Sequence, residues 1–540
     1  MPHLPGEGAF PVFQTDPRNS FMEKAKLEIL DLSGTASSLQ VLILDGCNKL
    51  QNIFLPDGLP QLLKSFSFDG YGPASHPVPN LTLPLKQERP SSLLSTKEDA
   101  STYKISLDGC SQLENLFVRG LPNIVELDLS GTAIRTLDFR TMVLEVPMLK
   151  RLFLLGCEHL HAIIWSNEER FRLDLLCIDT RAGISFPRPC IDRNKSFQLE
   201  VHAVVVDARL VRSLWKPLYY HYFATKDVYL NIHVTSAVCS GPTQFEVTYE
   251  KNKKIGMYGD QVDPLQLVQA DRYIDVQSMV GDAQMHAFPK PPTNNLDRHI
   301  KIAEGRHVFD SGVGDVMTMF AQSLHVHDVS TSASLPTGEW RLLRQCRMER
   351  CPKLVDTFWA SDLLTALWIC RKGYRRMNDG SFRNLQHLQL RSCPSLKFVL
   401  PVWFNSFPSL ETLHIIHCGH LRHVFVLNDK WHPEEISSKG VPFPKLTTIH
   451  LHDLPVLQQI CEVKMVAPEL KTIKIRGCWG LRQLPVVGAH SGDMKKPIVE
   501  IEKDIWDALE WDEQVAPGHF EAPLHSRYYK KKLPRVSVLR

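Results

Sequence analysis

A short leucine pattern that ends in cysteine recurs along this chain of 540 residues, and it constrains the fold more than any other feature. In a clear copy, Leu149, Leu152 and Leu154 are followed by Cys157 and then by Leu160. Seven of the thirteen cysteines occupy the same slot, and these are Cys47, Cys110, Cys157, Cys351, Cys393, Cys418 and Cys478. A pattern repeated at one spacing predicts one local structure repeated along the chain.

The pattern predicts a short strand followed by a turn in every copy. The two apolar residues of a Leu-x-Leu pair point to one side of a strand, while their neighbours point to the other. The chain then turns at the cysteine, whose small buried thiol we expect to contact backbone amides of the turn. One copy cannot bury its own apolar face, so the copies must stack.

The period of the pattern identifies the fold. From Leu107 to Leu129, Leu154 and Ile178, the strand ends advance by 22, 25 and 24 residues. These steps lie within the ~20–29 residues typical of leucine-rich repeats. We therefore predict an α/β leucine-rich-repeat solenoid, a horseshoe with a parallel concave sheet and an irregular or short-helical convex side.

The regularity of the repeats divides the chain into five parts. We expect a lead-in segment at 1–26, repeats over 27–180 with a loop insertion at about 71–102, and clear repeats again over 341–501. A cap helix, with Trp506 and Leu509 facing inward, and a basic tail fill 502–540. Region 181–340 keeps strand-like pairs, which favours degenerate repeats, although an inserted domain is the alternative; the pairs begin at Leu199, Leu230, Ile274, Ile300 and Leu324.

Composition excludes several classes of protein. The formal net charge of +3 is too small to indicate binding to nucleic acid or to an anionic membrane. Residues 1–11 lack the basic and apolar regions of a secretory signal, and no apolar run approaches ~18 residues, so we expect no membrane span. The odd number of cysteines, without a Cys-x-x-Cys pair, favours free thiols in the cytoplasm or the nucleus.

Motifs for catalysis or cofactor binding do not occur in the sequence. It contains neither Gly-x-x-x-x-Gly-Lys-[Ser/Thr], Gly-x-Ser-x-Gly nor His-Glu-x-x-His, so we expect no enzyme activity and no cofactor. One segment is rich in metal-ligating residues: His414, His417, Cys418, His420 and His423. Because the repeat frame directs these side chains to different sides, we expect no metal site there.

The outward strand positions are the candidate binding residues, because solenoids bind proteins on such surfaces. Early in the chain these positions are acidic, and later they are polar or basic. The early set is Asp31, Asp45, Asp108, Glu126 and Asp128, and the later set is Gln389, Arg391, His414, His450, His452, Lys474 and Arg476. This change of charge along the chain fits a surface that binds two charged partners, or two parts of one partner, at its two ends. It equally fits the ordinary solvation of a sheet.

Four segments carry more specific forms of the repeat. They read Leu-Asp-Leu-Ser-Gly-Thr-Ala-Ile at 127–134, Leu-Phe-Leu-Leu-Gly-Cys at 152–157, Phe-Pro-Ser-Leu-Glu-Thr-Leu at 407–413 and Glu-Lys-Asp-Ile-Trp-Asp-Ala-Leu-Glu-Trp at 502–511. In these forms the chain resembles the C-terminal leucine-rich-repeat region of plant intracellular nucleotide-binding leucine-rich-repeat disease resistance proteins, particularly the cereal type. The resemblance covers about 27–180 and 340–511.

The resemblance implies a non-catalytic protein-binding module, the recognition or autoinhibitory part of an immune receptor in the defense response. Its partner would be a pathogen effector, a host guardee, or a nucleotide-binding domain in cis or in trans. The family's nucleotide-binding domain has no counterpart in this sequence, so the resemblance implies a sensor or autoinhibitory half without the nucleotide switch, from a truncated gene, a mis-split gene model or a stand-alone decoy. Alternatives are the substrate receptor of a ubiquitin ligase, for which residues 1–26 are too short to hold the adaptor-binding motif, and a stand-alone interaction scaffold.

Overall fold

The computed structural model consists of two compact units, Met1–Asp297 and Arg298–Arg540, which are described separately. The residues that it describes are 40–47, 49–50, 52–54, 62–71, 101–166, 173–182, 197–219, 227–235, 296–303, 311–329, 340–354, 382–402, 407–427, 440–487, 496–511 and 516–525. Of the positions considered above, Asp31 and Ile274 lie outside these ranges. Among the described residues, no helix is both long and apolar enough to cross a membrane.

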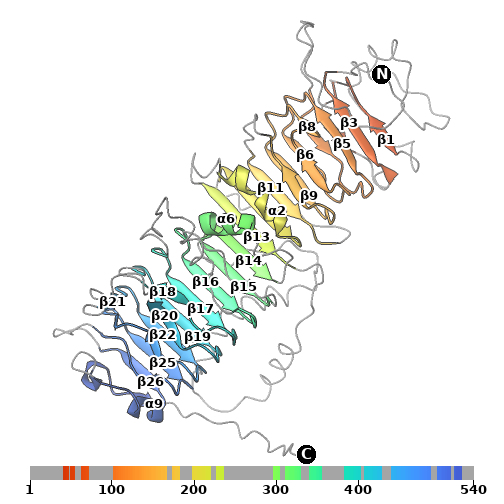
Figure 1. The fold of residues 1–540 in the computed structure, drawn as a ribbon. Coiled ribbons are helices and arrows are strands. Elements are labelled where there is room, and N and C mark those ends of the chain that lie inside the picture. The colour runs from red at the N-terminus through yellow and green to blue at the C-terminus, as the bar shows by residue number, and fades with distance from the viewer. Residues whose placement is uncertain are drawn as a thin grey trace, which may run out of the picture. The chain divides into compact units, whose positions relative to one another are not determined.

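Parallel strands stack side by side in the first unit (Figure 1). Its main sheet has the order β2 (Asn52–Phe54), β4 (Lys104–Ser106), β6 (Glu126–Asp128), β9 (Arg151–Leu155), β11 (Leu175–Asp179), β12 (Leu199–Val205) and β13 (Val228–Val234). Every pair of neighbours is parallel. Short helix α2 (Arg209–Arg212) buries Leu210 and Val211. The predicted parallel-sheet solenoid is confirmed.

A second set of parallel strands forms the other side of this unit. It has the order β1 (Val41–Ile43), β3 (Ser65–Asp69), β5 (Asn115–Arg119) and β8 (Val143–Leu144), and β7 (Thr136–Asp138) pairs with β10 (Ala162–Ile164). The Leu42 and Phe66 strands, which fit the repeat pattern, belong to this set and not to the main sheet. They lie there because their own inward residues, including Phe66 and Phe68, pack into the core from the opposite side.

The second unit repeats this arrangement. Its main sheet has the order β14 (Arg298–Ala303), β15 (Ser323–His327), β16 (Gln345–Glu349), β17 (His387–Arg391), β19 (Thr412–Ile416), β22 (Thr448–His452), β25 (Thr472–Arg476), β26 (Ile498–Ile501) and β27 (Leu524–His525). The other side carries helix α6 (Ser311–Phe320) and short parallel strands: β18 (Leu400–Val402), β20 (His423–Leu427), β23 (Gln459–Cys461), β21 (Val441–Pro442) and β24 (Met465–Val466).

The strand-like pairs of region 181–340 take part in these sheets wherever they are described. Those beginning at Leu199 and Leu230 lie on β12 and β13, and those beginning at Ile300 and Leu324 lie on β14 and β15. Each of these strand pairs is parallel and in register. The arrangement is the one that degenerate repeats would have.

Inward side chains build one continuous core in each stack. In the second unit, Phe407, Phe425 and Phe443 are fully buried, with ring centroids 5.1–5.7 Å apart. Their large apolar areas stabilise the contact between neighbouring repeats.

The cysteines of the repeat slot are buried as expected, and they contact backbone carbonyls as well as amides. All seven are free thiols. The Sγ atoms of Cys351, Cys393 and Cys478 lie 3.3–3.5 Å from the carbonyl oxygen two residues earlier. The thiol therefore donates to a carbonyl of its turn, and the expected amide contact is also present, since backbone amides of Thr132 and Leu454 approach the sulfurs of Cys157 and Cys478.

The C-terminal helix is shorter than expected. Helix α9 (Lys503–Asp507) buries Ile505, and Leu509 beyond it is also buried. Trp506 is only half-buried and packs against Trp511 and the buried Phe520. The short 3₁₀-helix η2 (Pro517–His519) brings Phe520 to this place. The expected inward position of Trp506 is thus wrong, because the helix presents Ile505 to the core.

Candidate protein-binding surface

The outward residues of β17, β19, β22 and β25 form a half-exposed surface that we name the polar face. It comprises Gln389, Arg391, His414, His450, His452, Lys474 and Arg476. The strand register places Gln389, His414, His450 and Lys474 in one row, and Arg391, Ile416, His452 and Arg476 in the next. All seven later-chain candidates therefore share one sheet of the second unit.

The histidines of the polar face contribute less charge than the sequence suggests. The rings of His414 and His450 are stacked with centroids 4.5 Å apart and 10° between their planes. Burial, together with the nearby charges of His414 and Lys474, lowers the pKa of His450 from 6.5 to about 3. His450 is therefore neutral at pH 7, and the cations of the face are Arg391, Lys474 and Arg476.

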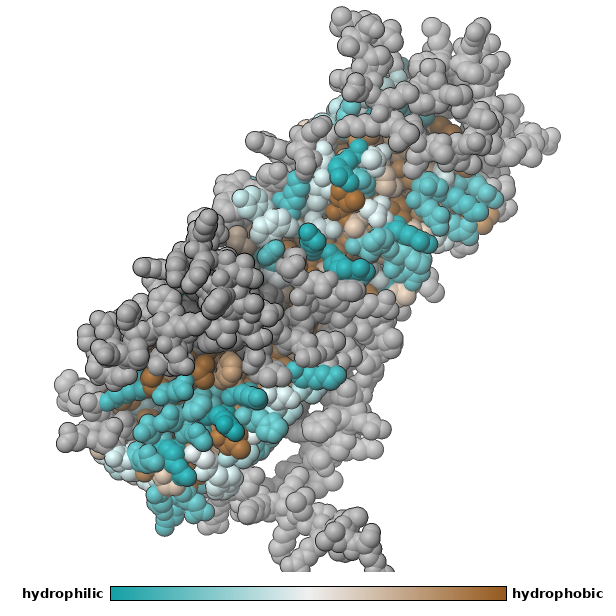
Figure 2. All heavy atoms as spheres, viewed as in Figure 1, coloured by the Kyte–Doolittle hydropathy of each residue, from teal (hydrophilic) through white to brown (hydrophobic). Residues whose placement is uncertain are grey.

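Lys474, at the edge of the polar face, forms one long ion pair. Lys474 Nζ lies 3.5 Å from a carboxylate oxygen of Glu500, and both side chains are partly exposed. Exposed pairs of this kind contribute only ~0–1 kcal/mol. Lys474 can therefore leave Glu500 for an acidic group on a partner at little cost. Figure 2 shows that hydrophilic residues gather over the C-terminal end of this unit on the face in view.

The neighbouring strands β15 and β16 carry a closed ion network. The buried Glu349 accepts two hydrogen bonds from Arg347, at 3.1 and 3.0 Å. Arg350 binds Asp328 through two hydrogen bonds of 2.6 and 2.8 Å. Burial would raise the pKa of Asp328, but the bonds from Arg350 and His327 hold it well below its usual range. Arg347 with Glu349 and Arg350 with Asp328 thus place paired charges on the strands beside the polar face.

Acidic candidates of the first unit have local roles. Asp108 is exposed in a turn. Asp45 is half-buried, and its Oδ1 accepts hydrogen bonds of 2.9 Å from the hydroxyl of Ser67 and the amide of Asp69. Asp45 thereby connects β1 to β3. Its carboxylate holds the stack together at this point.

Glu126 and Asp128 do not have the exposure that we expected. Their exposed fractions are only 4% and 1%. Lys104 and Arg151, which face Glu126 from the two adjacent strands, lie 2.9 and 3.0 Å from its carboxylate and cover it. Asp128 accepts a bond of 3.1 Å from the amide of Ser130. The expectation of an exposed acidic surface is wrong for both residues, because neighbouring strands supply the cover.

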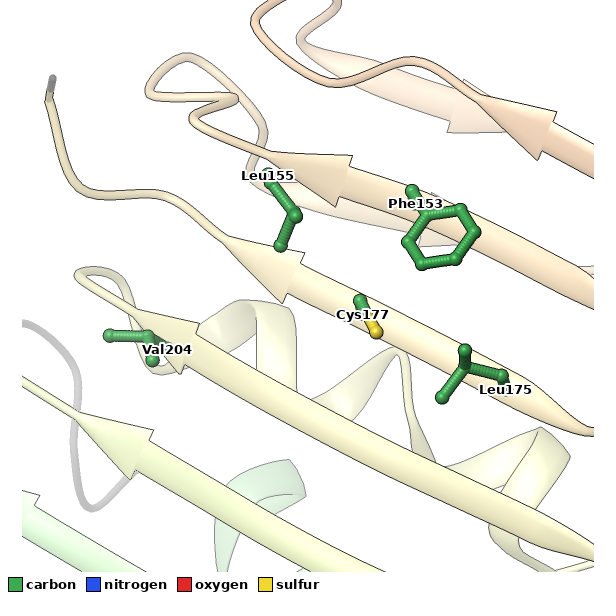
Figure 3. Close-up of a cluster of buried hydrophobic side chains, with 5 residues drawn as sticks. All are labelled: Phe153, Leu155, Leu175, Cys177 and Val204. Atoms are coloured by element: carbon green, nitrogen blue, oxygen red, sulfur yellow. The ribbon is translucent and has the colours of Figure 1, made fainter. Parts of the chain in front are cut away.

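An apolar cluster occupies the outward side of β9, β11 and β12 (Figure 3). Its members are buried: Phe153, Leu155, Leu175, Cys177 and Val204. The sequence analysis missed this cluster, although a signal exists in the unbroken apolar runs at 152–155 and 175–178. Strands that are buried on both faces show such continuous runs, where half-exposed strands alternate.

The side chains of the histidine-rich segment lie on different sides of the repeat, as the repeat frame predicts. Cys418 is buried in the core, His414 stacks on His450, and His420 is exposed in the turn. His423 begins β20 on the other side of the stack. His417 alone approaches a second group of ligands, because it lies beside His452 and Asp453.

Comparison with known proteins agrees with the geometry. Residues 360–488, which contain the whole polar face, match the family described as "Plant disease resistance protein RPS2-like, leucine-rich repeats". This part of the chain is similar to the leucine-rich repeats of plant disease resistance proteins. The match and the polar face thus lie on the same strands of the second unit.

Curated relatives carry the same description. The chain is 30% identical over 141 residues to disease resistance protein RPS5 of Arabidopsis thaliana, covering 26% of this chain and 15% of that protein. It is 27% identical over 139 residues to disease resistance protein SUMM2 of the same plant, covering 25% and 15%. The chain therefore spans only about a seventh of the length of these relatives. A chain of the solved mouse RP105/MD-1 complex aligns with this chain at a TM-score of 0.19 and 12% identity, covering 84% of this chain and 76% of that chain.

Proposed function

We propose that this chain is the recognition or autoinhibitory part of a plant immune receptor and that it acts inside the cell, in the cytoplasm or the nucleus. Its polar face binds a protein partner, which would be a pathogen effector, a host guardee or a nucleotide-binding domain. The similarity to disease resistance proteins supports the biological setting. The buried free thiols support a reducing compartment. No feature of the described residues favours the alternative of a ubiquitin-ligase receptor.

The observation that carries the proposal is the register of the polar face. Four consecutive parallel strands hold Arg391, Lys474 and Arg476 half-exposed at fixed spacing, within the residues that match the family. A rigid array of cations selects an acidic surface through charge complementarity, which governs specificity and association rate. His414 and the neutral His450 lie between these cations and offer hydrogen bonds and ring contacts to the same partner.

Selection from a display library tests the proposal. Plant and pathogen proteins would be selected for binding to the intact chain, and the affinity of each selected protein would then be measured with charge-reversed variants. Arg391→Glu combined with Lys474→Glu should weaken binding at least ~10-fold, or about 1.4 kcal/mol. The matched control is Lys445→Glu with Arg482→Glu, which reverses two exposed charges outside the polar face. If selected proteins bind both double variants equally well, the polar face is not the recognition surface.

A further inference from the structure

Two histidines and an aspartate meet at the edge of the second unit's sheet. His452 is the last residue of β22, Asp453 follows it, and His417 follows β19 on the adjacent strand. Nδ1 of His417 lies 3.0 Å from Oδ2 of Asp453, and Nε2 of His452 lies 3.7 Å from the same oxygen. One ligand atom from each of the three residues lies within 4.8 Å of the other two.

The backbone holds these side chains in place. His417 and Asp453 both adopt the left-handed conformation, with φ of 56° and 53°. Their amides donate to the carbonyl oxygens of His452 and Arg476, at 2.9 and 2.7 Å. Gly477 adjoins the carboxylate so closely that a Cβ there would lie 2.4 Å from Oδ1 of Asp453. The three groups are thus presented by hydrogen-bonded turns of a continuous sheet, and such support is what a metal site requires.

The distances suit a small transition-metal ion. Zinc binds imidazole nitrogen at ~2.0–2.1 Å and carboxylate oxygen at ~2.0–2.2 Å, so the ligands of a tetrahedral site lie about 3.3 Å apart. The observed separations of 3.0 and 3.7 Å bracket this value. Imidazole ligands favour zinc, nickel or copper, whereas magnesium and calcium prefer oxygen alone.

We propose that His417, His452 and Asp453 bind a divalent transition-metal ion of the zinc type. The side chains of His417 and Asp453 are 43% and 32% exposed, so water can supply a fourth ligand. The positive charge of Arg476 acts on Asp453 and opposes the ion, which limits the affinity. Without metal, the pairing of His417 with Asp453 satisfies both groups. This inference stands independently of the proposed function.

Cobalt binding to the full chain tests the site, because Co²⁺ replaces zinc and reports its ligands by colour. We expect one Co²⁺ per chain to give visible d–d bands without a thiolate charge-transfer band, and Zn²⁺ to displace it. His452→Ala and Asp453→Asn should each weaken Co²⁺ binding at least ~10-fold. Asparagine also tolerates the left-handed backbone, so Asp453→Asn preserves the turn.

His420→Ala is the matched control, since His420 is an exposed histidine on the turn that follows His417. It should bind Co²⁺ as the unmodified chain does. A thermal melt provides a second readout: Zn²⁺ should raise the Tm of the unmodified chain and of His420→Ala, but not that of Asp453→Asn. A thiolate band, or equal Co²⁺ affinity for the unmodified chain and His452→Ala, would overturn the assignment.

Discussion

At the scale of single residues, the position before the cysteine slot determines the turn. It adopts a positive φ in repeat after repeat, as glycine at Gly46, Gly109, Gly131, Gly156 and Gly477, and as another residue at Asp328, Arg350, Ser392, His417 and Asp453. This conformation directs its amide to a carbonyl of the next strand, as from Gly131 to Leu155 at 2.7 Å. A non-glycine residue there is strained by ~1–2 kcal/mol, which the stacked neighbours must offset.

Gly131→Ala tests this requirement. The alanine would keep the φ of 68°, and its Cβ would lie 3.3 Å from the backbone of Gly109. We expect the free energy of unfolding to fall by about 1–2 kcal/mol, measured from the urea midpoint. Gly419→Ala is the control, because its Cβ would meet no atom within 4 Å. Equal destabilisation by both substitutions would contradict the strain argument.

The slot thiols should be inert towards alkylating reagents. Burial raises the pKa of Cys110 and of Cys478 to about 12, with a smaller contribution from nearby carboxylates. Since the thiolate is the reactive form, both cysteines should resist iodoacetamide at pH 8 and react once the chain is unfolded. Peptide mapping by mass spectrometry checks this. Rapid labelling of these two peptides in the native protein would show that the stack opens.

At the scale of elements, the side chain of Glu502 completes the backbone hydrogen bonding of the turn that follows β25. Earlier turns donate their amide to a backbone carbonyl, but the amide of Gly477 donates to both carboxylate oxygens of Glu502, at 3.0 and 3.2 Å. Glu502 is itself buried at the start of α9. Its carboxylate therefore takes the place of a backbone carbonyl of the adjacent strand β26, which it directly follows, and connects the turn after β25 to the start of α9.

Glu502→Ala should leave this amide without its partner. Unsatisfied buried donors cost ~1–3 kcal/mol. We expect faster hydrogen exchange at Gly477 and at the paired residues of β26, with little change in the first unit. Glu510→Ala, at an exposed position nearby, is the control. Unchanged hydrogen exchange at Gly477 in Glu502→Ala would show that the carboxylate does not protect the turn after β25.

Repeat elements could be predicted from the sequence because their signal is local and periodic. Leucine spacing located the strands at Leu107, Leu154, Leu390 and Ile475, and the cysteine slot located the turns. Second-side strands such as β20 were missed, since they lack the Leu-x-Leu form. The His417, His452 and Asp453 group was also missed, because it depends on the register between β19 and β22, which lie 36 residues apart.

At the scale of the whole molecule, the outward sheet surface changes character along each stack. The positions flanking the leucines can be identified from the sequence, but their exposure depends on which side chains cover them. Glu126 is covered by basic neighbours, and Phe153 belongs to a buried apolar cluster. In the polar face, β17, β22 and β25 keep the alternating half-exposed pattern that a periodic sequence predicts. Long-range cover of this kind leaves no periodic signal, so it limits what a sequence alone can show.

Buried histidines on this surface should set the acid limit of the folded second unit. His299 is buried on β14, and its Nδ1 lies 3.0 Å from the hydroxyl of Ser323. Burial, together with the charges of His325 and Lys301, lowers its pKa from 6.5 to about 3. Between pH 6.5 and pH 3, His299 binds a proton in the unfolded chain but stays neutral in the folded chain. Stability is therefore complete above pH 6.5 and is lost progressively towards pH 3.

The expected loss is about 2 kcal/mol between pH 6.5 and pH 5, since each pH unit in this window costs ~1.4 kcal/mol. His299→Gln keeps a hydrogen-bonding group near Ser323 but has no proton to gain, so its unfolding free energy should depend less on pH. Urea unfolding of the second unit at several pH values measures both slopes. Other buried histidines, such as His325, retain part of the slope in the variant. Identical slopes for the variant and the unmodified chain would mean that His299 already holds its proton when folded.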